Sequence, residues 1–275
     1  MTRIVNNCVA LVCLCLFWGQ SLRAADASHS EQIKWGNESV FNEEHNTLGL
    51  FSGVLGGQIV WAGGTSDDYS RWGRNAVCLS ENAGFALYED VLSKPLAYGA
   101  SITLSDGILC IGGRDSSQCY KDVFLVTMQQ GKLNVSEDWP PLPFPLSNAA
   151  GALLDNKVYL FGGRKSVSPS RLSDSFFVLD LSNKSRGWKE LPGYPGCVRE
   201  DAILVVQNNG VSPCLYLLGG QTETEEGLSS CLTDGYVYNP QLGKWSSLGS
   251  DFPKGICAAV ASGANHILLF QKEPE

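Results

Sequence analysis

A pair of adjacent glycines recurs four times at a nearly constant spacing, and this recurrence constrains the fold more than any other feature of the sequence. Each pair closes a short apolar run: "GQIVWAGG", "GILCIGG", "KVYLFGG" and "CLYLLGG". The pairs are Gly63-Gly64, Gly112-Gly113, Gly162-Gly163 and Gly219-Gly220, so the steps are 49, 50 and 57 residues. A period near 50 residues indicates repeated units of supersecondary structure.

Other features keep the same register as the glycine pairs. A strand pattern precedes each apolar run ("FSGVL", "GASITL", "GALL", "AILVV"), and another follows it ("NAVCLS", "KDVFLV", "SDSFFVLDL", "TDGYVYN"). A tryptophan lies 25 or 26 residues beyond the second glycine in the last three units, at Trp139, Trp188 and Trp245, with Tyr88 near that place in the first unit. Four strands, a glycine pair and a spaced tryptophan resemble the kelch repeat, which forms one blade of a β-propeller.

The resemblance implies an all-β propeller with four clear blades, at about residues 47–96, 97–146, 147–198 and 199–254, and a partial fifth at 255–275. The continuous apolar runs fit this fold, because neighbouring blades cover both faces of an inner strand. A composition of 30 glycines with only 17% charged residues also fits short strands and tight turns. One alternative is that residues 26–46, around Trp35, supply an outer strand that closes the ring at five blades. The other, which we favour, is an incomplete or degenerate ring, such as an incomplete six-bladed one.

The N-terminus has the pattern of a secretory signal peptide over residues 1–25. Arg3 precedes an apolar run at 8–18, and small residues follow around Ala24 and Ala25. We therefore expect a periplasmic or secreted protein without a stable membrane anchor after cleavage. An uncleaved anchor is the alternative. Seven of the ten cysteines then remain, without a C-x-x-C pair, and core thiols are favoured over a disulfide framework.

Charge and composition narrow the partners. The net charge is −8 and no basic stretch occurs, which argues against nucleic acid and anionic membranes as partners. There are three histidines, so a histidine-built metal site is not expected, and no motif calls for a cofactor. A protein partner stays open.

Two segments carry a more specific resemblance. "PLAYGASITLSDGILCIGG" and "WPPLPFPLSNAAGALLDNKVYLFGG" are similar to the kelch-propeller sialic-acid mutarotases, the N-acetylneuraminate epimerases. The order of the segments is rotated, because "LAYGAS" precedes "PLPFPL", and this indicates the cyclically permuted branch of that family. A ring tolerates such rotation, since any loop between blades can carry the termini.

The resemblance implies an enzyme that interconverts the α and β anomers of N-acetylneuraminate by general acid–base catalysis, with an arginine on the sugar carboxylate. In characterised members a glutamate in an N-G-E stretch and an arginine six residues later are implicated. No N-G-E stretch occurs in these 275 residues, so neither residue can be assigned here. The second hypothesis is therefore a non-catalytic propeller that binds a glycan or a protein at its channel mouth.

The blade geometry nominates site residues in the loops that follow the glycine pairs and precede the inner strands. Three arginines, Arg114, Arg164 and Arg199, would make a positive mouth suited to an anionic sugar, unless each pairs with a nearby carboxylate, as Arg114 could with Asp115. Glu200 is the candidate for the catalytic base, with an exposed turn carboxylate as the alternative. Tyr98 could stack on a sugar or pack the channel wall. Arg171 could extend over the mouth from its loop.

Overall fold

The computed structural model describes residues 48–80, 84–224 and 226–271. The expected signal peptide and the segment at 26–46 lie outside the described residues. The described chain is all-β apart from one short 3-10 helix, η1 (Leu181–Arg186), and it forms four antiparallel four-stranded sheets and three two-stranded ones, of which the last in the chain is the partial fifth unit. The prediction of four blades plus a partial fifth is confirmed. Within these residues we find no helix with the length and apolar character needed to cross a membrane.

Each blade is a meander whose strands follow one another outward from the axis. Blade 1 contains β1 (Phe51–Leu55), β2 (Gln58–Ala62), β3 (Ala76–Ser80) and β4 (Gly84–Tyr88). Blade 2 contains β5 (Ala100–Thr103), β6 (Ile108–Ile111), β7 (Val123–Gln129) and β8 (Lys132–Ser136). Blade 3 contains β9 (Ala150–Leu154), β10 (Lys157–Phe161), β13 (Phe176–Asp180) and β14 (Lys189–Leu191). Blade 4 contains β15 (Ile203–Asn208), β16 (Pro213–Leu218), β19 (Gly235–Asn239) and β20 (Lys244–Gly249), and the partial fifth contains β21 (Ile256–Ser262) and β22 (His266–Gln271).

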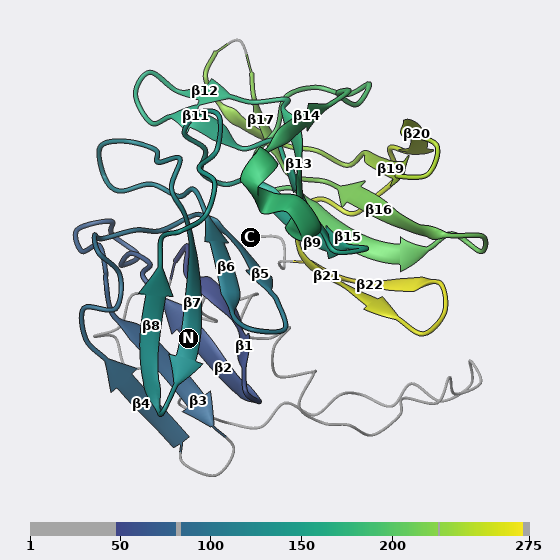
Figure 1. The fold of residues 1–275 in the computed structure, drawn as a ribbon. Coiled ribbons are helices and arrows are strands. Elements are labelled where there is room, and N and C mark those ends of the chain that lie inside the picture. Colours follow the sequence, from purple (N-terminus) through teal and green to yellow (C-terminus); the bar gives the residue numbers. More distant parts are fainter. Residues whose placement is uncertain (1–47, 81–83, 225, 272–275) are drawn as a thin grey trace, which may run out of the picture.

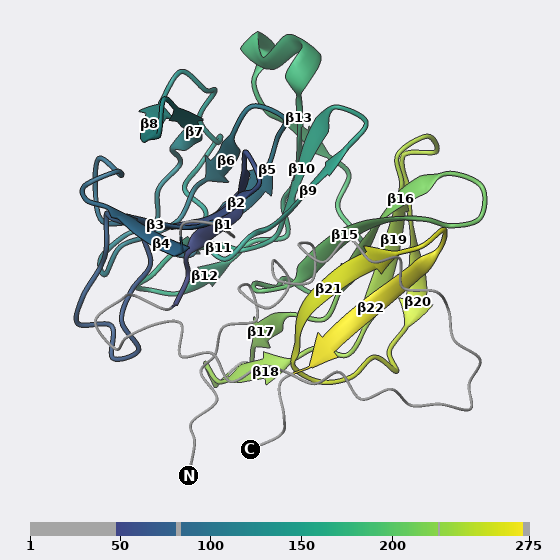
Figure 2. The ribbon, with the colours of Figure 1, turned by 90° about the horizontal axis from the view of Figure 1, so that it is seen from below.

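Blades 3 and 4 each carry an extra hairpin directly after the glycine pair. These hairpins are β11 (Arg164–Ser166) with β12 (Arg171–Leu172), and β17 (Gln221–Glu223) with β18 (Ser229–Cys231). The innermost strands β1, β5, β9, β15 and β21 contact one another in that order, so the five units follow one another around a common axis (Figures 1 and 2).

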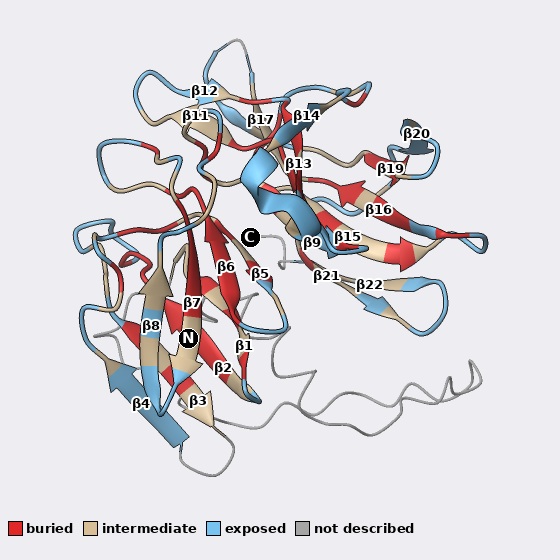
Figure 3. Cartoon of the chain, viewed as in Figure 1, coloured by how far each residue is buried: buried red, intermediate tan, exposed pale blue. Residues whose placement is uncertain are grey.

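The core lies between the blades. In β10, Val158 and Leu160 pack into the cluster shared with blade 2, and Tyr159 and Phe161 pack into the cluster shared with blade 4. Both faces of this strand are therefore buried, which explains its unbroken apolar sequence. Figure 3 shows the same concentration of buried residues in β6, β7 and β16, whereas the outer strand β4 is mostly exposed.

The aromatic residues at the constant spacing also lie between blades. Trp139 and Trp188 pack against the cluster of blades 2 and 3, and the indole nitrogen of Trp188 donates to the Pro140 carbonyl at 3.0 Å. Trp245 joins the cluster of blades 3 and 4, with its ring centroid 5.1 Å from that of Phe176. Four of the seven described cysteines, Cys78, Cys110, Cys119 and Cys214, are buried in the core.

The glycine pairs connect each blade to the next. In blade 2 the N–H of Gly113 donates at 2.8 Å to the carbonyl of Leu146, on the segment that leads into the inner strand of blade 3, and a Cβ atom on Gly112 would lie 2.2 Å from the same oxygen. Blades 1 and 3 repeat the bond, from Gly64 to Leu96 and from Gly163 to Arg199, both at 2.9 Å. The backbone of both glycines is also left-handed. Only glycine combines this conformation with so close an approach of another chain segment.

The four repeats provide an internal test of this explanation. We predict that Gly112→Ala lowers the free energy of unfolding by at least about 3 kcal/mol, because backbone strain and the clash with Leu146 add together. Gly219→Ala at the corresponding position of blade 4 is the matched control, since its nearest neighbour is the Leu232 carbonyl at 3.4 Å. The control should cost about 1–2 kcal/mol, from the left-handed backbone alone. Urea unfolding measures both, and equal losses would contradict the role assigned to the carbonyl.

Candidate functional site

A cavity of about 560 Å³ lies at the end of the axis where the inner strands begin. Its wall comes from the segments that lead into the inner strands of all five units, and from the residues after the fourth glycine pair. The lining residues are Gly49, Leu50, Tyr98, Gly99, Asn148, Ala149, Asp201, Ala202, Ile203, Gly220, Gln221, Cys231, Gly255, Ile256 and Cys257. A volume in this range is typical of small-molecule sites.

One backbone position recurs in every unit around this cavity, and we call it the ring position. It is occupied by Gly49, Tyr98, Asn148, Asp201 and Gly255, whose φ angles are 65°, 60°, 55°, 52° and 69°. This left-handed conformation disfavours residues with a Cβ atom, and units 1 and 5 have glycine there. Blades 2, 3 and 4 instead keep an aromatic ring, an amide and a carboxylate at the cavity wall. Strain retained at such a place indicates a functional site.

Backbone hydrogen bonds link the successive ring positions. The N–H of Tyr98 donates to the carbonyl of Gly49 at 2.7 Å, that of Asn148 to Tyr98 at 2.7 Å, and that of Asp201 to Asn148 at 3.0 Å. The left-handed backbone turns each N–H toward the preceding blade, which allows these bonds. Three polar side chains from three blades are therefore held in fixed order around the cavity.

Asp201 is the carboxylate that the cavity exposes. The amide nitrogen Nδ2 of Asn148 donates to its Oδ1 at 2.9 Å. The side chain is open to the cavity, but the channel walls surround it, and this loss of bulk water raises the pKa of Asp201 to about 6. The bond from Asn148 acts in the opposite direction and favours the ionised form. A carboxyl that titrates near neutral pH can both accept and donate a proton.

Arg114 lies at the rim beside Tyr98. Its guanidinium carbon is 4.6 Å from the centroid of the Tyr98 ring and 5.1 Å from that of Trp72. The alternative that Arg114 pairs with Asp115 is not observed, since the Asp115 carboxylate instead accepts bonds from Tyr120 and Ser117. Arg74, Lys94, Arg164 and Arg199 are held in ion pairs. Arg114 has no carboxylate partner among the described residues, and its NH1 donates a long bond of 3.5 Å to the backbone carbonyl of Asp115. The stacked Arg114 therefore presents a cation to an incoming anion.

Arg164 and Glu200 form an ion pair with two hydrogen bonds. Nε of Arg164 donates to Oε2 of Glu200 at 2.8 Å, and NH2 donates to Oε1. The same guanidinium reaches Glu223 at 3.1 Å and Ser170 at 2.8 Å, so it joins the hairpin of blade 3 to that of blade 4. These bonds raise the pKa of Arg164. Glu200 is buried with both oxygens bonded, so the geometry favours Asp201 over Glu200 as the proton-transfer group.

Arg199 does not contribute to the mouth, which corrects the expectation of three arginines there. Its side chain is 0% exposed, and its guanidinium bonds both oxygens of Asp234, at 2.7 and 2.8 Å, together with the hydroxyl of Tyr194. The reason lies in the register, since Arg199 stands two residues before the ring position, where blades 2 and 3 have the buried Leu96 and Leu146. The side chain at this position points into the blade interface.

The remaining candidates lie at the rim or in the wall. Tyr98 lines the cavity, and its ring packs against Trp72, with centroids 6.3 Å apart. It is therefore part of the channel wall, and stacking on a sugar stays a prediction. Burial raises the pKa of Tyr98, and a hydrogen bond with Tyr69 adds to this. Arg171 is exposed on β12. Across the described residues no group of three histidine, cysteine, aspartate or glutamate side chains could hold a metal ion.

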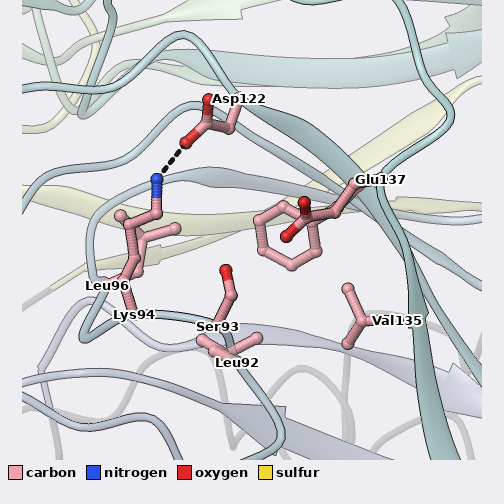
Figure 4. Close-up of a pocket in the computed structure, with 8 residues that line it drawn as sticks. Leu92, Ser93, Lys94, Leu96, Asp122, Val135 and Glu137 are labelled. Atoms are coloured by element: carbon pink, nitrogen blue, oxygen red, sulfur yellow. Dashed lines mark hydrogen bonds and ion pairs between the residues drawn. The ribbon is translucent and has the colours of Figure 1, made fainter.

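A second, much smaller cavity lies between blades 1 and 2 (Figure 4). Its lining includes Leu92, Leu96 and Val135, and the ammonium of Lys94 bonds Asp122 across it at 2.5 Å. Lys94 also lies 4.3 Å from the centroid of the Tyr120 ring. Since its volume of about 20 Å³ has room for a single water, this cavity is a feature of blade packing.

Comparison with known proteins supports the family resemblance over the C-terminal half of the chain. Residues 139–271 match the model of the family described as N-acetylneuraminate epimerase. The N-acetylneuraminate epimerases of Yersinia pestis (strain Pestoides F) and Haemophilus influenzae (strain PittEE) are 30% identical over 139 residues and 31% identical over 131 residues. These matches cover 49% and 48% of this chain, but only 33% and 32% of the relatives, so the matched segment spans about a third of their length.

Two further matches extend this comparison. A protein of Vibrio cholerae described as a kelch domain-containing protein is 31% identical over 121 residues, which are 44% of this chain and 31% of that protein. The solved structure titled "Structure of YjhT" superposes with a TM-score of 0.63 over 80% of this chain and 76% of that one, at 15% identity. That likeness confirms the propeller fold. The family match includes Asn148 and Asp201, whereas Tyr98 and Arg114 lie before it.

The structural role of Arg199 can be tested by substitution. We predict that Arg199→Leu costs about 3 kcal/mol or more of unfolding free energy, because Asp234 keeps a largely buried charge without its partner. Adding Asp234→Asn removes that charge and should restore part of the loss, since leucine is the residue of blades 2 and 3 at this position. Urea unfolding of the two variants decides the matter. A double variant as unstable as the single one would argue against this role.

The raised pKa of Asp201 predicts a pH-dependent effect on stability. An unfolded aspartate titrates near pH 3.9, so between about pH 4 and 6 the folded state binds more protons than the unfolded state. The contribution of Asp201 therefore becomes less favourable as the pH rises through this window. Asp201→Asn removes this dependence. The Tm of the variant minus that of wild type should therefore become larger as the pH is raised from 4 to 7. Asp106→Asn, in an exposed turn, is the control and should follow wild type throughout.

Proposed function

Because residues 139–271 match the N-acetylneuraminate epimerases, we propose that this protein is a sialic-acid mutarotase that interconverts the α and β anomers of N-acetylneuraminate. One observation carries the proposal: a single cavity combines an unpaired guanidinium at its rim with a carboxyl that titrates near neutral pH. An acidic monosaccharide needs both groups, one for its carboxylate and one for its anomeric centre. The expected signal peptide would place the enzyme in the periplasm or outside the cell, and this stays a prediction.

The proposed substrate orientation follows from the positions of these groups. Arg114 binds the sugar carboxylate through two parallel hydrogen bonds, and the rings of Tyr98 and Trp72 hold the guanidinium plane for this purpose. Asp201 then lies on the adjoining wall of the same cavity, beside the anomeric carbon. The Tyr98 ring offers an apolar surface to the sugar.

The proposed chemistry is proton transfer during ring opening and closure. Ionised Asp201 takes the proton from the anomeric hydroxyl as the bond between the anomeric carbon and the ring oxygen breaks. Protonated Asp201 returns the proton to the ring oxygen through water in the cavity, which leaves an open-chain keto acid. Rotation about the bond to the carbonyl carbon and the reverse transfer then close the ring as the other anomer. No atom is gained or lost in the cycle.

A relaxation experiment tests this function. We expect micromolar protein to speed the conversion of freshly dissolved α-N-acetylneuraminate, followed by proton NMR, above the rate in buffer. Arg114→Met should lower the rate at limiting substrate about ten- to a hundredfold, from the loss of about 1.5–3 kcal/mol of charge-assisted bonding. Arg186→Met removes an exposed cation from η1 and is the matched control. Asp201→Asn should abolish the acceleration.

The second candidate function is sugar binding without catalysis, and the same proteins distinguish it from the first. It is favoured by the bonding of Glu200, the base expected from the sequence, since both of its carboxylate oxygens accept bonds from Arg164. In that case the sugar would bind in an Arg114-dependent manner, measured by saturation-transfer NMR, while the anomers relax at the buffer rate. This result would reject the mutarotase and retain the site.

A further inference from the structure

We infer that Asn148 is a positioning residue, whose side-chain amide holds the Asp201 carboxylate in the orientation that it presents to a bound sugar. The mechanistic meaning of this inference rests on the proposed function, but the contact itself does not. Two bonds run in opposite directions between the same two residues. The backbone N–H of Asp201 donates to the Asn148 carbonyl at 3.0 Å, and Nδ2 of Asn148 donates to Oδ1 of Asp201 at 2.9 Å.

Asparagine at position 148 adopts a left-handed backbone that is less favourable for it than for glycine. Its presence there therefore calls for a compensating interaction. Glycine occupies the same left-handed position in units 1 and 5, where it adopts φ angles of 65° and 69° without strain. Asparagine is among the residues that best tolerate this conformation, but it is still less favourable than glycine. The hydrogen bond to Asp201 is what the amide adds. An alanine or serine at this position could not place a nitrogen donor on the next ring position.

The surroundings of Asp201 make this donor important. The charged and titratable groups that act on its carboxylate are Tyr98 and Arg114 from blade 2, Arg164 from blade 3 and Glu200 from blade 4. Arg164 is bonded to Glu200 and Glu223, and Arg114 is stacked on aromatic rings. Within the described residues, no other side chain makes a hydrogen bond with the Asp201 carboxylate. Asn148 thus fixes its direction.

The substitution Asn148→Gly tests the inference without straining the fold. It removes the amide, keeps the backbone bonds, and installs the residue that units 1 and 5 already use at this position. In protein labelled with ¹³C at the aspartate carboxyl carbons, the Asp201 signal is identified by its loss in Asp201→Asn. We expect its titration midpoint to move to higher pH in Asn148→Gly, because a donor that favours the ionised form is lost.

The chain offers a closely matched control in the same blade. Asn156, in the turn between β9 and β10, is also a left-handed asparagine, with φ 58° against 55° for Asn148. Its amide donates to the hydroxyl of Ser182 in η1. Asn156→Gly should leave the Asp201 midpoint unchanged. Thermal unfolding of both variants confirms that they are folded. The inference is overturned if Asp201 titrates at the same pH in wild type and Asn148→Gly.

The NMR titration and the relaxation experiment test the two proposals separately, so either proposal can be rejected while the other is retained. The NMR titration is recorded without sugar, so it reports on the contact between Asn148 and Asp201 whether or not the protein is an enzyme. A shifted midpoint in a protein that does not speed anomer relaxation would support the positioning role and reject the proposed function. Where relaxation is observed, Asn148→Gly should also move the acidic limb of the pH–rate profile in the same direction as the titration.

Discussion

The structure depends on one recurring hydrogen bond between neighbouring blades. At the entrance of the inner strand of blades 2, 3 and 4, a carbonyl accepts the N–H of the second glycine in the preceding unit, as Leu146 does from Gly113. The bond is possible because neither glycine carries a side chain and both have a left-handed backbone. It sets the spacing of the blades at the end of the axis where the cavity lies. The residues two positions later, which form the ring, therefore come together as a consequence of the blade contact.

Three arginines near the cavity differ in their partners, and this difference determines which of them offers a positive charge to a ligand. Arg199 and Arg164 have the same charge as Arg114, but their donors are occupied by Asp234 in one case and by Glu200 and Glu223 in the other. These pairs fasten blade 4 and the two hairpins. Arg114 is held by aromatic faces, which orient the guanidinium, and its NH1 makes a long bond of 3.5 Å to the Asp115 carbonyl, so no carboxylate of the described residues neutralises it. An acidic protein can in this way offer a localised positive group to an anion.

The fold was predictable from the sequence, because a propeller repeats its strands, glycine pairs and aromatic residues at one period. The site was only partly predictable. Tyr98 lines the cavity and Arg114 stacks on it, but their contact with a sugar stays a prediction. The roles of adjacent residues such as Arg199, Glu200 and Asp201 depend on the direction in which each side chain points. An alignment of the four repeat sequences places Arg199 at the same position as Leu96 and Leu146. That correspondence predicts a buried side chain. The ion pairs Arg164–Glu223 and Arg199–Asp234 join loops that are far apart in the sequence. A local sequence pattern therefore cannot predict them.

The ring position also determines where the binding preference of such a channel could change during evolution. Gly49 has no room for a side chain, because a Cβ atom there would lie 2.8 Å from the ring carbon Cγ of Tyr98. A large residue in one blade thus dictates a small one in its neighbour. Among the residues that the structure describes, no atom lies within 4 Å of a Cβ atom placed on Gly255. Asparagine or aspartate at that place would add a new polar group to the wall while the existing ones stay where they are, so the fifth unit is the natural point of divergence toward other ligands.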